Sequence, residues 1–342
     1  MPQPDGASYN CRMARVGITG LTGMIGRNFL DYYRLRGARG DGPELVALSR
    51  QATAPAFLED IPCRRVDFAD PASFAGALED LQAVVHLAGL VRASRPLDFY
   101  RANRDGTAVL LEALARYGSG VRHLLYASSQ TAVGPVPAGQ EATDESSPCR
   151  PVSHYGASKL AAEQAVRAAP LAWTILRLPA VWGRYDPDGL NVLKAARGGL
   201  LPALGGAEPV LSYIFAQDLA PILPALILNE KLYGGTFNVC YDRPVRLGEY
   251  YLAVRRLLDL PPRLLRLPLP RWMGYGAMAA LAAARRLGVG DPAATPDKVR
   301  EFMGGRWVQS NRRLKQTLGL GELRESGALA DTVRWFREQG LL

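Results

Sequence analysis

The sequence predicts an α/β protein whose centre is a doubly wound parallel sheet, followed by a smaller C-terminal lobe. Three observations predict this class. Short apolar runs of strand length recur through the first half of the chain, helical patterns alternate with them, and a glycine-rich turn follows the first run. Runs that are apolar throughout are typical of strands covered by helices on both faces. Past Trp182 the alternation breaks into glycine- and proline-rich segments with scattered helices.

The first strand begins after a short N-terminal segment. Residues 1–14 lack the apolar core of a signal peptide, so we expect a disordered extension, or an upstream start before Met13. Folding is expected to begin at about Arg15. The β-branched apolar run over 16–19 then predicts a strand.

A glycine turn and a helix follow this strand, and the helix opens at Met24. In such a unit the first glycine permits the tight turn, the second lets the backbone approach a pyrophosphate, and the third lets the helix pack closely on the strand. The phosphate would lie at the helix N-terminus, where amide groups point outward. We therefore predict a dinucleotide site of the Rossmann type. Its contacts are expected at Gly20, Thr22, Gly23, Met24, Ile25 and Gly26.

Further strands and helices continue the alternation. Strands are predicted at 45–48, up to Val66, and at 83–87, 121–127 and 173–178. Helices are predicted at 98–117 and 158–168. We therefore assign 15–183 to the Rossmann domain and 184–342 to the smaller lobe, some segments of which are expected to return to the sheet.

The composition limits the kinds of partner. With 342 residues and 48% hydrophobic content, the chain can bury one large or two modest cores. Its 41 Lys+Arg against 32 Asp+Glu are spread thinly, so nucleic acid is not indicated. The basic balance suits an anionic small molecule or a weak contact with an anionic membrane surface. The cysteines are far apart and histidines are few, so we expect no metal and a reducing, cytoplasmic location.

The stretch YGASK, residues 155–159, places a tyrosine and a lysine on one face of a helix. A phenol titrates near pH ~10, and a neighbouring ammonium lowers that pKa toward the range needed for acid/base work. From the pair alone two interpretations are open. It is either a catalytic pair or an ordinary helix start with a packed tyrosine and a solvated lysine.

Six motifs together resemble those of the extended short-chain dehydrogenase/reductases, also called the NAD-dependent epimerase/dehydratase superfamily. They are TGLTGMIG (19–26), HLAG (86–89), NRDGT (103–107), SSQTAVG (128–134), YGASK (155–159) and RLPAVWG (177–183). They come in the family's order and spacing, and the resemblance covers nearly all of 15–340. More diffusely, the C-terminal part resembles the branch of 3β-hydroxysteroid dehydrogenases. The resemblance favours the catalytic interpretation of YGASK and implies that the smaller lobe binds substrate.

The resemblance also implies a role for each matched position. Tyr155 would exchange a proton with the reacting carbonyl or alcohol, while Lys159 would lower the pKa of Tyr155 and hold the nicotinamide ribose. Ser129, by its spacing from the motif's last glycine, would bond to the substrate oxygen, whereas Ser128 is expected to be structural. Asn103 would brace the active site. The remaining cofactor contacts are expected at Leu87, Ala88, Gly89, Pro179, Ala180 and Val181.

The end of the second strand predicts the choice of cofactor. NAD-specific enzymes of this type place a carboxylate there, whereas this strand ends with Ser49 and Arg50. A hydroxyl and a guanidinium suit a 2′-phosphate, so we expect NADP(H) to be favoured over NAD(H), with Asp67 and Phe68 near the adenine. The alternative is that Arg50 is a solvated loop residue.

We expect His86 and His154 to be structural rather than catalytic.

Departures from the family pattern narrow the reaction. Gln130 and Thr131 stand where sugar-nucleotide dehydratases carry two carboxylates, which argues against dehydration, and Val133 and Trp182 replace the tyrosines usual in sugar-nucleotide enzymes. We expect an NAD(P)-dependent oxidoreductase that interconverts a hydroxyl and a ketone on a lipophilic or secondary-metabolite substrate. The alternatives are a nucleotide-sugar 4-epimerase and a non-catalytic, cofactor-sensing protein. The resemblance also suggests a homodimer.

One segment of the smaller lobe, residues 268–288, is unusually apolar. It holds thirteen uncharged residues from Trp272 to Ala284, fewer than the roughly 20 needed to span a bilayer. We expect a buried helix. The alternative is an amphipathic cover of the substrate mouth, in which Trp272, Met273, Tyr275 and Met278 touch a lipophilic ligand or a membrane surface.

Overall fold

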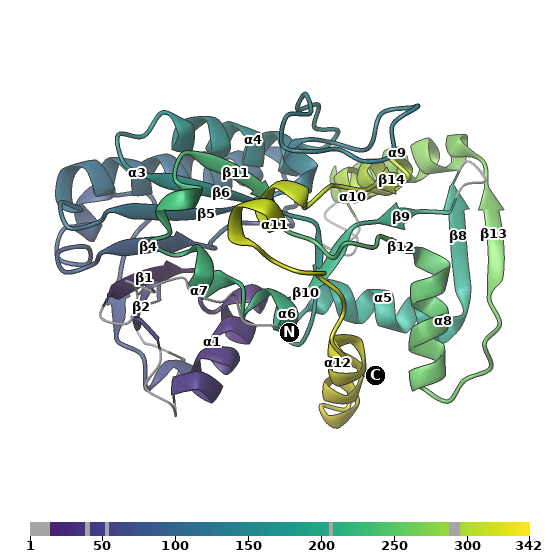
Figure 1. Ribbon diagram of the computed structural model, residues 1–342. Coiled ribbons are helices and arrows are strands. Elements are labelled where there is room, and N and C mark those ends of the chain that lie inside the picture. Colours follow the sequence, from purple (N-terminus) through teal and green to yellow (C-terminus); the bar gives the residue numbers. More distant parts are fainter. Residues whose placement is uncertain (1–13, 38–41, 52–54, 205–207, 287–294) are drawn as a thin grey trace.

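A computed structural model describes residues 14–37, 42–51, 55–204, 208–286 and 295–342. Its centre is a seven-stranded sheet in the order β11-β6-β5-β4-β1-β2-β3, and every pairing in it is parallel (Figure 1). Residues 1–13 of the expected extension lie outside the described residues. Ala14 is buried and its carbonyl accepts a hydrogen bond from the Glu44 N–H, so the fold already includes Ala14.

Six of the seven strands lie where the apolar runs predict them, with ends that differ by at most two residues. They are β1 (Arg15–Thr19), β2 (Glu44–Ser49), β3 (Cys63–Arg65), β4 (Ala83–His86), β5 (His123–Ser129) and β6 (Trp173–Leu178). The seventh, β11 (Gly235–Asn238), comes from the C-terminal half and pairs with β6. The predicted doubly wound parallel sheet is confirmed.

Helices cover both faces of this sheet (Figure 1). One face packs on α3 (Gly106–Tyr117) and α4 (His154–Arg167), while the other packs on α1 (Met24–Gly37) and part of the C-terminal half. Neighbouring residues of a strand therefore enter different cores. Val84 belongs to the α3/α4 side and Val85 to the α1 side. Because both faces are buried, the strands read as continuous apolar runs.

The helix predicted over 98–117 is divided into three parts. They are α2 (Pro96–Phe99), a π-helical segment η3 (Tyr100–Asp105) and α3. A π-helical turn inserts an extra residue and is frequent at functional sites. Within η3, Asn103 is turned inward and is 1% exposed.

The C-terminal half consists of short elements around small sheets, in which β7 pairs with β10, β8 with β13, and β9 with both β12 and β14. Its strands are β7 (Ala180–Trp182), β8 (Leu200–Leu204), β9 (Val210–Leu211), β10 (Tyr213–Phe215), β12 (Val245–Arg246), β13 (Leu265–Leu269) and β14 (Arg306–Trp307). Its helices are α5 (Pro187–Gly198), α6 (Ala216–Leu219), α7 (Leu223–Leu226), α8 (Leu247–Leu257), α9 (Arg271–Arg286), α10 (Pro296–Met303), α11 (Arg312–Leu318) and α12 (Ala328–Glu338). Short 3-10 turns, η1 (Ala56–Leu58), η2 (Pro71–Phe74), η4 (Gln130–Ala132) and η5 (Glu230–Leu232), complete the described chain.

Helix α9 corresponds to the apolar segment and packs on α10 through one face (Figure 1). Gly274 is buried there, and a Cβ on it would lie 2.7 Å from Met303 Sδ. The other face is open, since Trp272 is 71% and Tyr275 60% exposed. The expectation of a buried helix is wrong, because the partner surface covers only one side of α9. Within the ranges described above, the helices are all too short or too polar to cross a bilayer.

Candidate active site

The first turn of α4 carries Tyr155 and fixes its position. Ser153 caps the helix by accepting a hydrogen bond from the Gly156 N–H at 3.0 Å. Any side chain on Gly156 would collide with the carbonyl oxygen of Thr131. The glycine therefore lets the helix start pack directly on the turn after β5, which brings Tyr155 next to Ser129.

Ser129 and Ser128 have different surroundings. The Ser129 Oγ accepts hydrogen bonds from the Thr131 Oγ1 at 2.8 Å and from the Thr131 N–H at 3.2 Å, which leaves its own hydrogen to donate. The Ser128 hydroxyl instead donates to the buried carboxylate of Glu163 at 2.6 Å. Arg177 also pairs with Glu163, at 2.9 Å. Ser128 thus belongs to a buried structural network, whereas Ser129 faces Tyr155.

Lys159 is 4% exposed, one helical turn after Tyr155. Its Nζ donates to the Ala127 carbonyl oxygen at 2.7 Å and lies 4.3 Å from the centre of the Tyr126 ring. Burial lowers the pKa of the Lys159 ammonium to about 7, although the nearby Glu163 carboxylate opposes that shift. Lys159 is therefore a buried side chain held on the end of β5.

The pKa of Tyr155 differs from the expectation. Burial raises it, and the two groups that oppose the rise are the Lys298 ammonium and the Ser129 hydroxyl. The Tyr155 ring lies 5.9 Å from that of Phe99, and the Lys298 Nζ lies 5.7 Å from its centre. We expected Lys159 to lower the pKa of Tyr155. That expectation is wrong, because the Lys159 ammonium donates to the Ala127 carbonyl oxygen and is not among the groups that shift this pKa.

Asn103 ties the loop after β4 to the catalytic helix. Its Oδ1 accepts a hydrogen bond from the Leu90 N–H at 2.7 Å, and its Nδ2 donates to the Leu90 carbonyl at 3.0 Å and to the Ser158 Oγ at 2.9 Å. Ser158 in turn donates to the Tyr155 carbonyl at 2.7 Å. A Cβ on Gly89 would lie 3.1 Å from the Asn103 Oδ1. Asn103 therefore acts as a brace between neighbouring elements.

His86 is a buried, neutral connector. Its Nδ1 lies 2.6 Å from the Thr19 Oγ1, which accepts from the Ala88 N–H, and its Nε2 lies 3.1 Å from the Thr107 Oγ1, which donates to the Asn103 carbonyl. This chain of donors places the imidazole hydrogen on Nε2. Burial lowers the pKa of His86 to about 3, with a further contribution from Lys159. His154 lies at the start of α4, with its Nδ1 3.5 Å from the Tyr100 hydroxyl.

The glycine turn after β1 forms a bare backbone surface at the start of α1. Gly20 has φ +74° and lies so close to the segment after β4 that a Cβ would be 2.6 Å from the Ala88 nitrogen. A Cβ on Gly26 would lie 2.5 Å from the Leu21 Cα. Thr22 and Gly23 are exposed beside the partly exposed Met24 and Ile25, and the first turn of α1 carries no acidic residue. This cradle fits a pyrophosphate because the glycine backbone allows a close approach and the amides at a helix N-terminus point outward.

The other predicted cofactor contacts lie around the same edge of the sheet. Ser49 ends β2, where its Oγ accepts from the Gln51 N–H, and Arg50 is exposed beside it. Asp67 is exposed after β3, and the Phe68 ring stacks 5.9 Å from His86. At the ends of β4 and β6 lie the predicted contacts Leu87, Ala88, Gly89, Pro179, Ala180 and Val181, the last two of which belong to β7.

Sequence reasoning missed three charged residues of α10 that contact the start of α4. The Asp297 Oδ2 accepts from the Tyr155 N–H at 3.2 Å, and the Glu301 Oε1 accepts from the Ser153 hydroxyl at 2.8 Å. Lys298 pairs with Glu301 at 3.0 Å. The sequence marks only a helix start, with Thr295 as cap and Pro296 after it. No spacing links this helix to Tyr155, which precedes it by more than a hundred residues.

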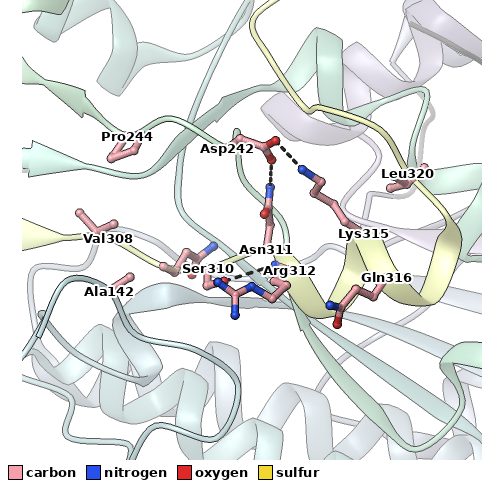
Figure 2. A pocket seen from close by; sticks show the side chains of 11 residues that line it. Ala142, Asp242, Pro244, Val308, Ser310, Asn311, Arg312, Lys315, Gln316 and Leu320 are labelled. Atoms are coloured by element: carbon pink, nitrogen blue, oxygen red, sulfur yellow. Dashed lines mark hydrogen bonds and ion pairs between the residues drawn. The ribbon is translucent and has the colours of Figure 1, made fainter.

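Among the described residues, two cavities are lined mainly by the C-terminal half. One, of about 380 Å³, lies between α9 and α10 and includes Lys298 in its wall. The other, of about 520 Å³, lies beside α11, where Lys315 pairs with Asp242 and Asn311 donates to the same carboxylate at 2.7 Å (Figure 2). The wall of this second cavity contains none of the predicted catalytic or cofactor-binding residues.

Across the described residues, His, Cys, Asp and Glu side chains form no group that could hold a metal ion.

Comparisons with known proteins agree on one family. Residues 16–240 match the model of the NAD dependent epimerase/dehydratase family. The chain is 29% identical to a ceramide reductase of Caulobacter vibrioides, covering 96% of each, and 28% identical to sterol demethylase protein B of Methylococcus capsulatus, covering 95% of this chain and 99% of that one. The structure of Thermus thermophilus UDP-glucose 4-epimerase in complex with NAD aligns with a TM-score of 0.69 and 26% identity, covering 94% of this chain and 99% of that one.

Proposed function

The chain belongs to the NAD dependent epimerase/dehydratase family, and on that premise we propose that it is an NAD(P)-dependent oxidoreductase that interconverts a hydroxyl and a ketone on a lipophilic substrate. The observation that carries the proposal is the convergence of Ser129, Tyr155 and Lys159 at the carboxyl end of β5. The similarity to a ceramide reductase and to sterol demethylase protein B supports the lipophilic class. A secondary metabolite of similar polarity belongs to the same class.

The residues divide the chemistry as follows. The Ser129 hydroxyl, whose acceptor positions are taken by Thr131, donates to the substrate oxygen and orients it. When bound, a nicotinamide cofactor would supply a hydride for the carbonyl carbon, or take one up in the reverse direction. Tyr155 gives its proton to the oxygen, so that the C=O double bond becomes a C–O single bond with one new C–H and one new O–H bond. Lys159, when protonated, places a positive charge at the end of β5, one helical turn from Tyr155.

The environment of Tyr155 favours the reductive direction. A phenol with an ordinary pKa of ~10 keeps its proton at neutral pH, and burial raises the pKa of Tyr155 further. A protonated group is ready to donate to a ketone, whereas oxidation of an alcohol needs the phenolate. We therefore expect ketone reduction to be faster than alcohol oxidation at pH 7, with saturating cofactor in each direction.

Substitution of Tyr155 tests the proposal. Tyr155→Phe is expected to lower kcat by about a hundredfold or more, because a positioned proton donor is lost. The ring remains, so the cofactor Kd is expected to change little. Steady-state kinetics and cofactor fluorescence measure the two quantities.

Tyr100→Phe is the matched control, since it removes a hydroxyl near His154 on the neighbouring segment. It is expected to retain activity. A Tyr155→Phe enzyme with wild-type turnover would mean that another group supplies the proton.

We also propose that NADP(H) is favoured. The carboxyl end of β2 carries no carboxylate and presents Ser49 and the exposed Arg50, and a carboxylate at this position is what selects NAD. Arg50→Ala is expected to weaken NADP(H) binding about tenfold or more while NAD(H) binding changes much less. Arg197→Ala, at an exposed position of α5, controls for the loss of one charge. An equal effect on both cofactors, or an NAD preference in the wild type, contradicts the proposal.

A nucleotide-sugar 4-epimerase is the second candidate. The similarity to the Thermus thermophilus enzyme favours this candidate. An epimerase begins by oxidising a hydroxyl to a ketone, which is the oxidative direction of the proposed oxidoreductase. The two candidates differ in net outcome. Incubation with UDP-glucose and catalytic cofactor yields UDP-galactose from an epimerase, whereas the proposed oxidoreductase consumes one cofactor molecule per turnover.

We further propose that the protein is a cytoplasmic homodimer with a weak affinity for anionic membrane surfaces. The dimer would pair α3 and α4 with those of a second copy, since α3 exposes the small side chains of Ala108 and Ala115. The cysteines of the described residues, Cys63, Cys149 and Cys240, are free thiols, as in reducing compartments. Sedimentation velocity, with Ala108→Arg as the interface variant, tests the dimer, and liposome flotation at low salt tests the membrane contact.

A further inference from the structure

The cavity between α9 and α10 has an almost wholly apolar wall. Its volume of about 380 Å³ falls within the range of roughly 300–1,000 Å³ usual for small-molecule sites. The wall combines side chains from β13, α9, α10 and the residue that caps α10. They are Leu269, Met273, Gly274, Ala277, Leu281, Thr295, Lys298, Val299 and Phe302.

The two polar side chains of this wall each have a partner within the protein. The Thr295 Oγ1 accepts a hydrogen bond from the Lys298 N–H at 3.1 Å as the cap of α10. The Lys298 ammonium pairs with Glu301 at 3.0 Å. The wall therefore offers few free donors or acceptors to a sugar or a diphosphate, whereas a hydrocarbon chain needs none.

Lys298 connects the cavity with the catalytic tyrosine. Its side chain lines the cavity, and its Nζ lies 5.7 Å from the centre of the Tyr155 ring. Asp297, the residue before it, accepts the hydrogen bond of the Tyr155 N–H. Helix α10 thus has one side on the catalytic helix and another on the cavity, and Lys298 borders both the cavity and the Tyr155 ring.

We infer that this cavity holds the aliphatic chain of the substrate whose ketone or hydroxyl lies at Tyr155. The inference rests on the proposed function and specifies the substrate as an amphiphile with a hydrocarbon chain close to its reacting carbon. Small residues of α9 create the space, since Ala277 and Gly274 present no bulk to it. Each methylene that enters the cavity is expected to raise kcat/KM roughly threefold to fourfold until the cavity is full.

A pair of variants on one helix tests the inference. Ala277→Phe fills the cavity, while Ala279→Phe adds the same ring at an exposed position that is not part of the wall. With a series of 3-ketones of increasing chain length, Ala277→Phe is expected to lower kcat/KM for the long-chain members at least tenfold and to leave the shortest unchanged. Ala279→Phe is expected to follow the wild type. Leu281→Ser, which makes the wall polar without filling it, is expected to flatten the dependence on chain length.

A binding measurement separates this inference from the proposed function. The probe 11-(dansylamino)undecanoate, which cannot be reduced, is expected to fluoresce with the wild type and Ala279→Phe and at least tenfold more weakly with Ala277→Phe. If the probe binds in this pattern and no ketone or alcohol turns over, the proposed function fails while the chain site stands. If ketones turn over without dependence on chain length, or the two alanine variants behave alike in both assays, the inference is overturned and the proposed function stands.

Discussion

Two buried histidines, His86 and His123, hold the sheet together as neutral hydrogen-bonding groups. The His123 Nδ1 accepts from the Leu228 N–H at 3.0 Å, while its Nε2 lies 2.9 Å from the Thr174 Oγ1, which donates to the Leu232 carbonyl. His123 therefore carries its hydrogen on Nε2, as His86 does. Burial lowers the pKa of each imidazole from 6.5 to about 3.

These shifts predict a loss of stability in acid. Well above pH 6.5 both histidines are neutral in the folded and unfolded states and contribute no slope. Below it the unfolded chain binds protons that the folded chain refuses, so the free energy of unfolding falls as the pH drops toward 3. Each histidine contributes at most about 1.4 kcal/mol per pH unit.

Urea unfolding at pH 7.0, 6.0, 5.0 and 4.5 measures this slope, and comparison with a histidine variant separates it from carboxylates, which titrate toward the lower end of the range. His123→Gln keeps a donor and an acceptor but cannot take up a proton, so it is expected to reduce the slope by about half. A wild type with equal stability at pH 7.0 and 4.5 would contradict the prediction. So would a variant with the wild-type slope.

At the scale of the element, the turn from β1 to α1 depends on close backbone contacts. Gly26 sits where a Cβ would lie 2.5 Å from the Leu21 Cα and 2.6 Å from the Gly20 carbonyl oxygen. Both neighbours are backbone atoms and cannot turn away. A methyl group at this position must therefore push α1 off the turn.

Gly26→Ala is expected to lower the free energy of unfolding by roughly 1–3 kcal/mol, the usual cost of overpacking. It is also expected to weaken cofactor binding about tenfold or more, because the helix N-terminus moves. Gly76→Ala is the control, since a Cβ there meets nothing within 4 Å. Thermal unfolding and cofactor titration measure both effects. Equal behaviour of the two variants would show that the turn tolerates a side chain.

The π-helical segment η3 is the second element that serves the site. It lies between α2 and α3 and turns Asn103 toward Leu90 and Ser158. A continuous α-helix over these residues would rotate Asn103 relative to the residues on either side. The brace between the loop after β4 and α4 therefore depends on this local irregularity.

At the scale of the whole molecule, the two halves of the chain share one core. A continuous apolar cluster joins Val16 and Leu30 of the first half to Leu219, Phe237 and Phe336 of the second. Strand β11 also completes the edge of the sheet by pairing with β6. The α1 face of the sheet therefore cannot bury its apolar surface without the second half, whereas the core on the α3/α4 face is made of first-half residues.

A chain that ends at Gly183 is therefore expected not to fold cooperatively, since it exposes the edge of β6 and the apolar face that carries Val16. In the full chain, far-UV circular dichroism and tryptophan fluorescence are expected to report one coincident urea transition. Trp173 reports on the first half and Trp335 on the second. Two separate transitions, or a native-like spectrum for residues 1–183, would contradict the prediction.

Features that depend on neighbours along the chain could be predicted from the residues alone. Continuous apolar runs predict strands buried on both faces, and the spacing of Gly20, Gly23 and Gly26 predicts the strand, turn and helix that the structure contains. The four-residue spacing of Tyr155 and Lys159 predicts that both lie on one helix, as they do on α4. These patterns are readable because helix and strand periodicities are local properties of the backbone.

Features that depend on contacts between distant segments could not be predicted in this way and came from the folded structure. Lys298 reaches the Tyr155 ring from α10, and burial, rather than the expected effect of Lys159, sets the direction of the tyrosine's pKa. The exposure of Trp272 and the cavity beside α9 likewise depend on how much of that helix α10 covers. Burial and electrostatic fields are sums over everything packed around a group, so no local pattern in the sequence contains them.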